Sequence, residues 1–82
     1  MSRKEELLDR FKSKPRDFRW DEFVSLMGHL GYQEQTGSGS RRKFINRSTG
    51  HVISMHKPHP SEILKSYQIK QVISALEDEG AI

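Results

Sequence analysis

The chain has 82 residues, enough for one compact domain and too few for two separate cores. It contains no cysteine, which excludes disulfide bonds and thiolate metal sites, so packing alone must hold the fold. No apolar stretch approaches the roughly 20 residues that cross a bilayer, and we therefore expect a cytoplasmic protein with no membrane segment.

The net charge of +3 is unevenly distributed along the chain. Acidic and basic side chains balance in residues 1–34, and acidic ones prevail in residues 62–82. Residues 35–61 contain five lysines and arginines, three histidines and no acidic residue. A segment of one sign attracts phosphate, whereas a merely solvated surface mixes both signs. The middle of the chain therefore predicts contact with nucleic acid or another polyanion, with a plain solvated hairpin as the alternative.

The first predicted element is a short helix over residues 4–11, with Leu7 and Phe11 on one side. A proline soon afterwards opposes its continuation. We interpret residues 1–16 as an N-terminal extension, an appendage to a domain that spans residues 17–82.

The second predicted helix begins near Trp20 and ends at Gly31, because glycine readily adopts the conformation that terminates helices. Asp21 and Glu22 favour the positive end of the helix dipole at its start. Its apolar residues recur at helical spacing and should face a sheet. This stripe consists of Trp20, Phe23, Leu26, Met27 and Leu30.

Between residues 32 and 56 the pattern changes to short β-like runs, separated by turn residues at 37–40 and 47–50. Three antiparallel strands follow from this pattern. A last helix is predicted over residues 66–79, with Ser66 as its cap and Gly80 as its end. Its apolar stripe consists of Ile69, Val72, Ile73 and Leu76. The sequence thus predicts an α+β fold of α-β-β-β-α order, with a three-stranded antiparallel sheet and the helices on one of its faces.

A four-residue loop at 47–50 fixes the register of the second and third strands. It places Asn46 opposite His51, and Arg41 opposite His56. Because side chains alternate between the faces of a strand, apolar and cationic residues separate. Phe44, Ile53 and Met55 are expected under the helices, while Arg41, Lys43, Ser54 and His56 share the other face. The Cβ atoms of directly paired residues lie about 5 Å apart, so Arg41 and His56 are expected to reach the same phosphate.

Other kinds of site receive little support from the sequence. The glycine-serine turn at 37–40 lacks the lysine and the following helix of a nucleotide-binding loop. His51, His56 and His59 invite a metal site, but no carboxylate or cysteine lies in the same segment and five cations would oppose a divalent ion. No serine has a local context that marks it as a nucleophile. We therefore expect no metal and no cofactor.

Several short motifs resemble those of one known family. They are Gly37-Ser38-Gly39-Ser40-Arg41-Arg42-Lys43-Phe44, then Val52-Ile53, His59-Pro60-Ser61-Glu62-Ile63, and a helix with Ile69, Val72 and Ile73. Together they resemble the HicA toxins of bacterial toxin–antitoxin systems, from about Trp20 to Gly80. The resemblance implies a fold like that of double-stranded-RNA-binding domains. It also implies a ribonuclease that cleaves messenger RNA without a metal, and a HicB-type antitoxin that neutralises it.

The chain departs from the family pattern at Arg41, where the family usually has a histidine. An arginine stays protonated and cannot act as a general base. As a catalytic residue, Arg41 can still bind phosphate through two hydrogen bonds and stabilise the charge that develops at phosphorus. His56 is then the best candidate acid or base because of its place opposite Arg41, and His59 follows because it matches the family's His-Pro. The residues predicted to contact RNA are Ser40, Arg41, Arg42, Lys43, Arg47 and Lys57.

Two other functions compete with that of a ribonuclease toxin. One is an RNA-binding domain that no longer cleaves, in which Arg41 improves affinity. The other is a protein-interaction module whose basic face receives an acidic partner, and this can coexist with the toxin if the antitoxin covers the site.

Overall fold

The computed structural model describes residues 3–82 and shows three helices and a three-stranded antiparallel sheet in that part of the chain. The α+β class and the α-β-β-β-α order predicted after the N-terminal segment are confirmed. None of the described helices is long and apolar enough to span a membrane. The elements are α1 (Arg3–Lys12), α2 (Trp20–His29), β1 (Tyr32–Thr36), β2 (Arg41–Asn46), β3 (Val52–His56) and α3 (Ser66–Asp78).

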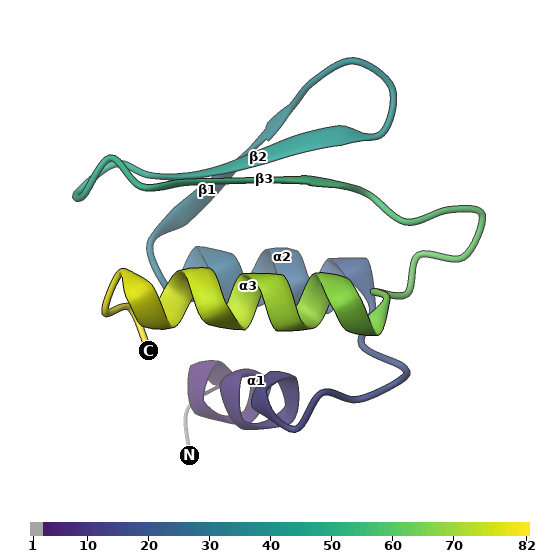
Figure 1. Cartoon of the computed structure of the whole chain (residues 1–82), viewed down its shortest axis with the longest axis horizontal. Helices are drawn as coiled ribbons and strands as arrows, with labels where there is room; N and C mark the ends of the chain where they lie inside the picture. Colours follow the sequence, from purple (N-terminus) through teal and green to yellow (C-terminus); the bar gives the residue numbers. More distant parts are fainter. Residues whose placement is uncertain (1–2) are drawn as a thin grey trace.

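The elements form layers (Figure 1). The sheet has the order β1-β2-β3, so β2 is central and β3 is an edge strand. Helices α2 and α3 lie against one face of the sheet, and α1 lies on their far side (Figure 1). The second face of the sheet carries no helix from the described residues, and we call it the open face. The likeness to double-stranded-RNA-binding domains stays a prediction.

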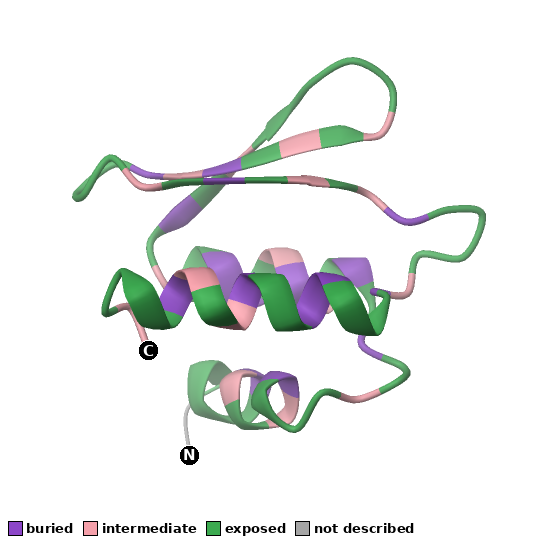
Figure 2. Ribbon diagram, in the orientation of Figure 1, coloured by how far each residue is buried: buried purple, intermediate pink, exposed green. Residues whose placement is uncertain are grey.

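The core extends from the sheet through α2 and α3 to α1, and Figure 2 shows buried residues in each of these layers. The two predicted helical stripes supply half of its buried residues, because their apolar residues recur on one side of each helix. From α1, Leu7 and Phe11 are also fully buried in the same core, and the Phe11 ring centroid lies 5.1 Å from that of Phe18. The N-terminal helix thus contributes side chains to the core, and the division into residues 1–16 and 17–82 stays a prediction.

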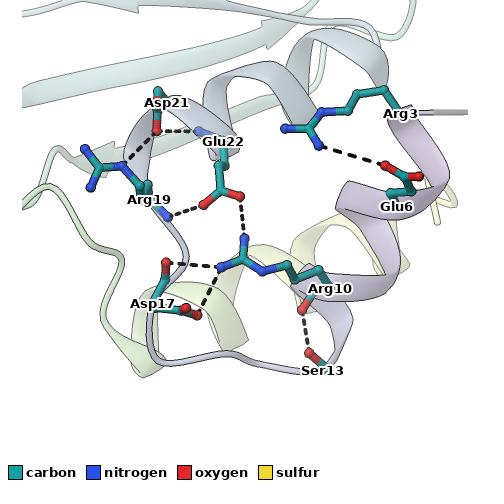
Figure 3. A network of polar contacts seen from close by, with 8 residues as sticks. All are labelled: Arg3, Glu6, Arg10, Ser13, Asp17, Arg19, Asp21 and Glu22. Carbon is teal, nitrogen blue, oxygen red and sulfur yellow. Dashed lines mark hydrogen bonds and ion pairs between the residues drawn. The ribbon is translucent and has the colours of Figure 1, made fainter.

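A polar network fixes α1 to the start of α2 (Figure 3). The Arg10 guanidinium donates to the Glu22 carboxylate and, at 3.0 Å, to that of Asp17. It also lies 5.0 Å from the centre of the Phe18 ring. Burial would raise the pKa of Glu22, but the hydrogen bonds from Arg10 and from the Arg19 amide outweigh burial, and the pKa lies below its usual value. The ion pair is therefore part of the packing between these helices.

The start of α3 corrects one prediction. Ser66 is the first helical residue and Lys65 is the residue before it, so Ser66 does not cap the helix. The side-chain oxygen of Gln68 accepts a hydrogen bond from the Lys65 amide at 3.0 Å. This is the half of a capping box in which the third helical residue binds back to the cap. The predicted end is close to the observed one, since Gly80 follows with φ of 76°.

Candidate nucleic-acid interface

The predicted register of β2 and β3 is confirmed. Arg41 pairs with His56, Lys43 with Ser54, and Phe44 with Ile53. The Asn46 amide donates to the His51 carbonyl at 2.9 Å, and the Gly50 amide donates to the Asn46 carbonyl at 2.7 Å. These two bonds close the loop at 47–50. They therefore fix the face of the sheet on which each residue pair of β2 and β3 lies.

The open face carries polar and cationic side chains. Phe44 and Ile53 are buried on the inner face and Met55 packs against them, as expected. The side chains on the other face of these strands are exposed and line a shallow hollow of about 400 Å³. Those that line it from the open face are Gln35, Arg41, Lys43, Ser54 and His56.

Two of the five cations in the basic segment are neutralised by acidic residues from outside it. Arg42 lies on the inner face, 16% exposed, with its guanidinium 3.7 Å from the Glu34 carboxylate. The Lys57 ammonium lies 3.4 Å from the Glu62 carboxylate. Because they are ion-paired and partly buried, these two side chains are less able to bind a phosphate.

The other three cations are exposed and form no ion pair with any residue in 3–82. They are Arg41, Lys43 and Arg47. Arg47 donates a hydrogen bond from its Nε to the side-chain oxygen of Gln33 at 2.8 Å, and Gln33 belongs to the open face of β1. The basic segment therefore presents three available positive charges, which is fewer than its composition suggested.

His56 is exposed beside these cations, and a hydrogen bond restrains its ring. The Nδ1 of His56 and the Oγ of Ser40 lie 3.2 Å apart. Ser40 is itself held, because its carbonyl accepts a hydrogen bond from the Lys57 amide at 2.7 Å. One ring nitrogen is thus engaged by the protein, and the other is left to exchange a proton with a ligand. Sequence reasoning placed Ser40 among the RNA contacts and missed its bond to His56.

The other two histidines of the basic segment lie before and after β3. His59 is exposed in the loop between β3 and α3, and its peptide bond to Pro60 is cis. The Nδ1 of His51 lies 2.6 Å from the Tyr32 hydroxyl, and burial raises the pKa of that phenol. We interpret His51 as a structural residue of the hairpin end. Within the described part of the chain, no three His, Cys, Asp or Glu side chains gather closely enough to hold a metal ion.

One functional candidate was missed by sequence reasoning. Gln68 is buried in the first turn of α3, and its Nε2 donates to the His56 carbonyl at 2.9 Å. No local pattern marks a glutamine for such a role. Only its position one residue before Ile69, at the margin of the apolar stripe, indicates that it faces the sheet.

The fold and the site define a small α+β domain that presents unpaired cations and an exposed histidine on one open sheet face. A family model described as the HicA toxin of bacterial toxin–antitoxin matches residues 20–78, which is most of the chain. The chain therefore belongs to the HicA toxin family, and the resemblance seen in its motifs is confirmed. Membership makes it a toxin of a toxin–antitoxin system and implies an antitoxin partner. Neither a curated protein nor a solved structure gives a significant match.

Proposed function

We propose that this chain is a toxin that binds messenger RNA on its open face and cleaves it without a metal ion. The observation that carries the proposal is the placement of His56 across from Arg41, with both side chains exposed on one hollowed surface. Arg41, Lys43 and Arg47 would contact phosphates as bidentate or point-charge donors. Ser40, Arg42 and Lys57 were also expected to bind RNA. Their bonds within the protein now favour supporting roles for them.

The chemistry would use the ribose of the RNA itself. His56 would take the proton of a 2′-hydroxyl through its free ring nitrogen, and the resulting oxygen would attack the adjacent phosphorus. The bond from phosphorus to the 5′-oxygen would break, and a protonated imidazole would give that oxygen a proton. His59 is the second candidate for this donor. Arg41 would stabilise the negative charge that develops on the phosphoryl oxygens.

A HicB-type antitoxin is the proposed partner. A protein that places acidic side chains over Arg41, Lys43 and Arg47 would neutralise the same charges that attract RNA, and would exclude RNA from His56. Binding and inhibition would then be one event. The cytoplasmic location expected from the sequence stays a prediction.

One specific observation favours a second function, RNA binding without cleavage. Arg41 stands where the family usually has a histidine, and a guanidinium supplies donors but no base. In that case Arg41 would raise affinity for RNA. The variant Arg41→His separates the two functions, because it should create cleavage in a protein that only binds and should at most change the rate in one that already cleaves.

The direct test is cleavage of an RNA transcript by the purified chain with a metal chelator present. We expect wild-type cleavage, a loss of about a hundredfold or more in His56→Ala, and no loss in His29→Ala, whose histidine is exposed on α2. The same RNA with methylated 2′-hydroxyls should stay intact, because the attacking group is blocked. Full activity in His56→Ala would remove His56 from the mechanism, and an inactive wild type that still binds RNA would favour the second function.

A further inference from the structure

The first turn of α3 holds a buried amide that touches the strand end where His56 lies. Gln68 is only 5% exposed, although glutamine is usually a surface residue. Its Nε2 donates to the His56 carbonyl at 2.9 Å, and its Oε1 accepts from the Lys65 amide at 3.0 Å. Both ends of the amide are engaged, so its orientation is fixed by its partners.

Helix capping explains only half of this arrangement. A residue at this position of a capping box needs an acceptor oxygen, and glutamate supplies one as well as glutamine does. The second contact needs a donor, which glutamate in its ionised form lacks. The amide of Gln68 is therefore specified by the His56 carbonyl, and the choice of glutamine follows from what it binds on β3.

The contact matters because β3 is the edge strand of the sheet. Backbone groups on the outer side of an edge strand have no neighbouring strand to bind. At the end of β3, Gln68 supplies the missing partner for the His56 carbonyl. The ring of the same residue is restrained by Ser40 from the β1–β2 turn. Helix α3 therefore restrains the backbone of His56, and the β1–β2 turn restrains its imidazole.

We propose that Gln68 is a positioning residue for His56, which ties the start of α3 to the strand end that presents the imidazole. This inference rests on the proposed ribonuclease function, in which His56 exchanges a proton with RNA. Gln68 itself would not touch the substrate, because it is buried beneath the sheet edge. Its effect is on the position of the imidazole relative to a bound phosphate, where a displacement near 1 Å costs on the order of a hundredfold in rate.

Two variants separate positioning from capping. Gln68→Glu keeps the acceptor for the Lys65 amide and loses the donor to His56, while Gln68→Met loses both at similar volume. We expect both variants to lower kcat for RNA cleavage about tenfold to a hundredfold with little change in KM. Gln68→Met should also lower the melting temperature through loss of the cap, and Gln68→Glu through burial of a carboxylate beside the His56 carbonyl. Gln71→Glu, which adds the same charge at an exposed position of α3, should behave as wild type.

An NMR measurement tests the inference even if the wild-type chain cleaves no RNA. We expect the backbone carbonyl and imidazole signals of His56 to shift in Gln68→Glu, while those of exposed His59 stay in place. Inactivity of the wild type would overturn the proposed function alone. Unchanged His56 signals, or a wild-type kcat in both Gln68 variants, would overturn the role of Gln68.

Discussion

Two arginine-containing regions of this small protein use the same side chain in opposite ways. On the far side of the helices from the sheet, Arg10 of α1 is engaged by two carboxylates (Figure 3) and fixes one helix to another. Its guanidinium also lies over an aromatic ring. On the open face, Arg41 is exposed and has no ion pair among residues 3–82. The number of basic residues therefore says less about a binding surface than the number of basic residues left without an acidic partner.

The contrast extends to neighbours on one strand. Arg41 and Arg42 are adjacent in β2, but alternation sends Arg42 to the inner face, where Glu34 neutralises it. The two arginines therefore offer a matched pair for experiment. Each substitution by glutamine removes one charge, and only the substitution of Arg41 is expected to weaken RNA binding.

The largest effect that we predict concerns the helical side. Phe11→Ala should lower the free energy of unfolding by about 3–5 kcal/mol, because the ring is fully buried against Phe18 and Phe23. Chemical denaturation would measure this loss. Lys12→Ala, at an exposed position of the same helix, should change stability by less than about 0.5 kcal/mol. Equal small losses in the two variants would mean that α1 is an appendage after all.

The next effect concerns the open face. Arg41→Gln should weaken RNA binding about tenfold, as expected for the loss of one charge-assisted contact with phosphate. It should also reduce the slope of log affinity against log salt by about 0.7–0.9. Arg42→Gln should change both quantities much less, because its charge is already neutralised. Fluorescence anisotropy over a series of salt concentrations would measure both. Identical losses of RNA affinity in the two variants would show that ion pairing does not decide which of these cations contributes to binding.

A smaller effect should appear when the Arg10 network is weakened. Glu22→Gln keeps the shape of the side chain and loses its charge, and it should lower the free energy of unfolding by about 1 kcal/mol at neutral pH. The folded-state pKa of Glu22 lies below the ordinary glutamate pKa of about 4.3. The ion pair therefore contributes its full stability above the ordinary pKa, and this stability is lost as the pH falls through the folded-state pKa.

The difference between wild type and Glu22→Gln should therefore shrink in acid, which denaturation curves at several pH values would show. As a control, Glu6→Gln breaks the exposed pair with Arg3 and should cost no more than a few tenths of a kcal/mol at neutral pH. A difference for Glu22→Gln that stays constant into acid would argue against the ion pair as its cause.

Much of the fold could be predicted from local signals. The loop at 47–50 has the length that fixes a hairpin register, and the register placed Arg41 opposite His56 as observed. The stripe from Trp20 to Met27 marked the helix that packs against the sheet. These features depend on near neighbours in the chain, and so the sequence contains enough information to predict them.

What could not be predicted depends on contacts between distant segments. The bond of Gln68 to His56 requires the start of α3 to return to the sheet, and no periodicity encodes that path. The pair of Lys57 with Glu62 depends on how the loop between β3 and α3 folds on itself. Arg42 is different, because alternation already placed it beside Met55 on the inner face. Its inclusion among the RNA contacts followed from composition, where the register was the better guide.

Titration of the isotope-labelled chain with a short single-stranded RNA tests most directly whether the open face contacts RNA, with backbone NMR shifts as the readout. We predict that the largest shifts fall on Arg41, Lys43, Arg47, Ser54 and His56, while residues of α1 stay unchanged. Shifts concentrated on α1 and α2, with the strands β2 and β3 unaffected, would contradict the account.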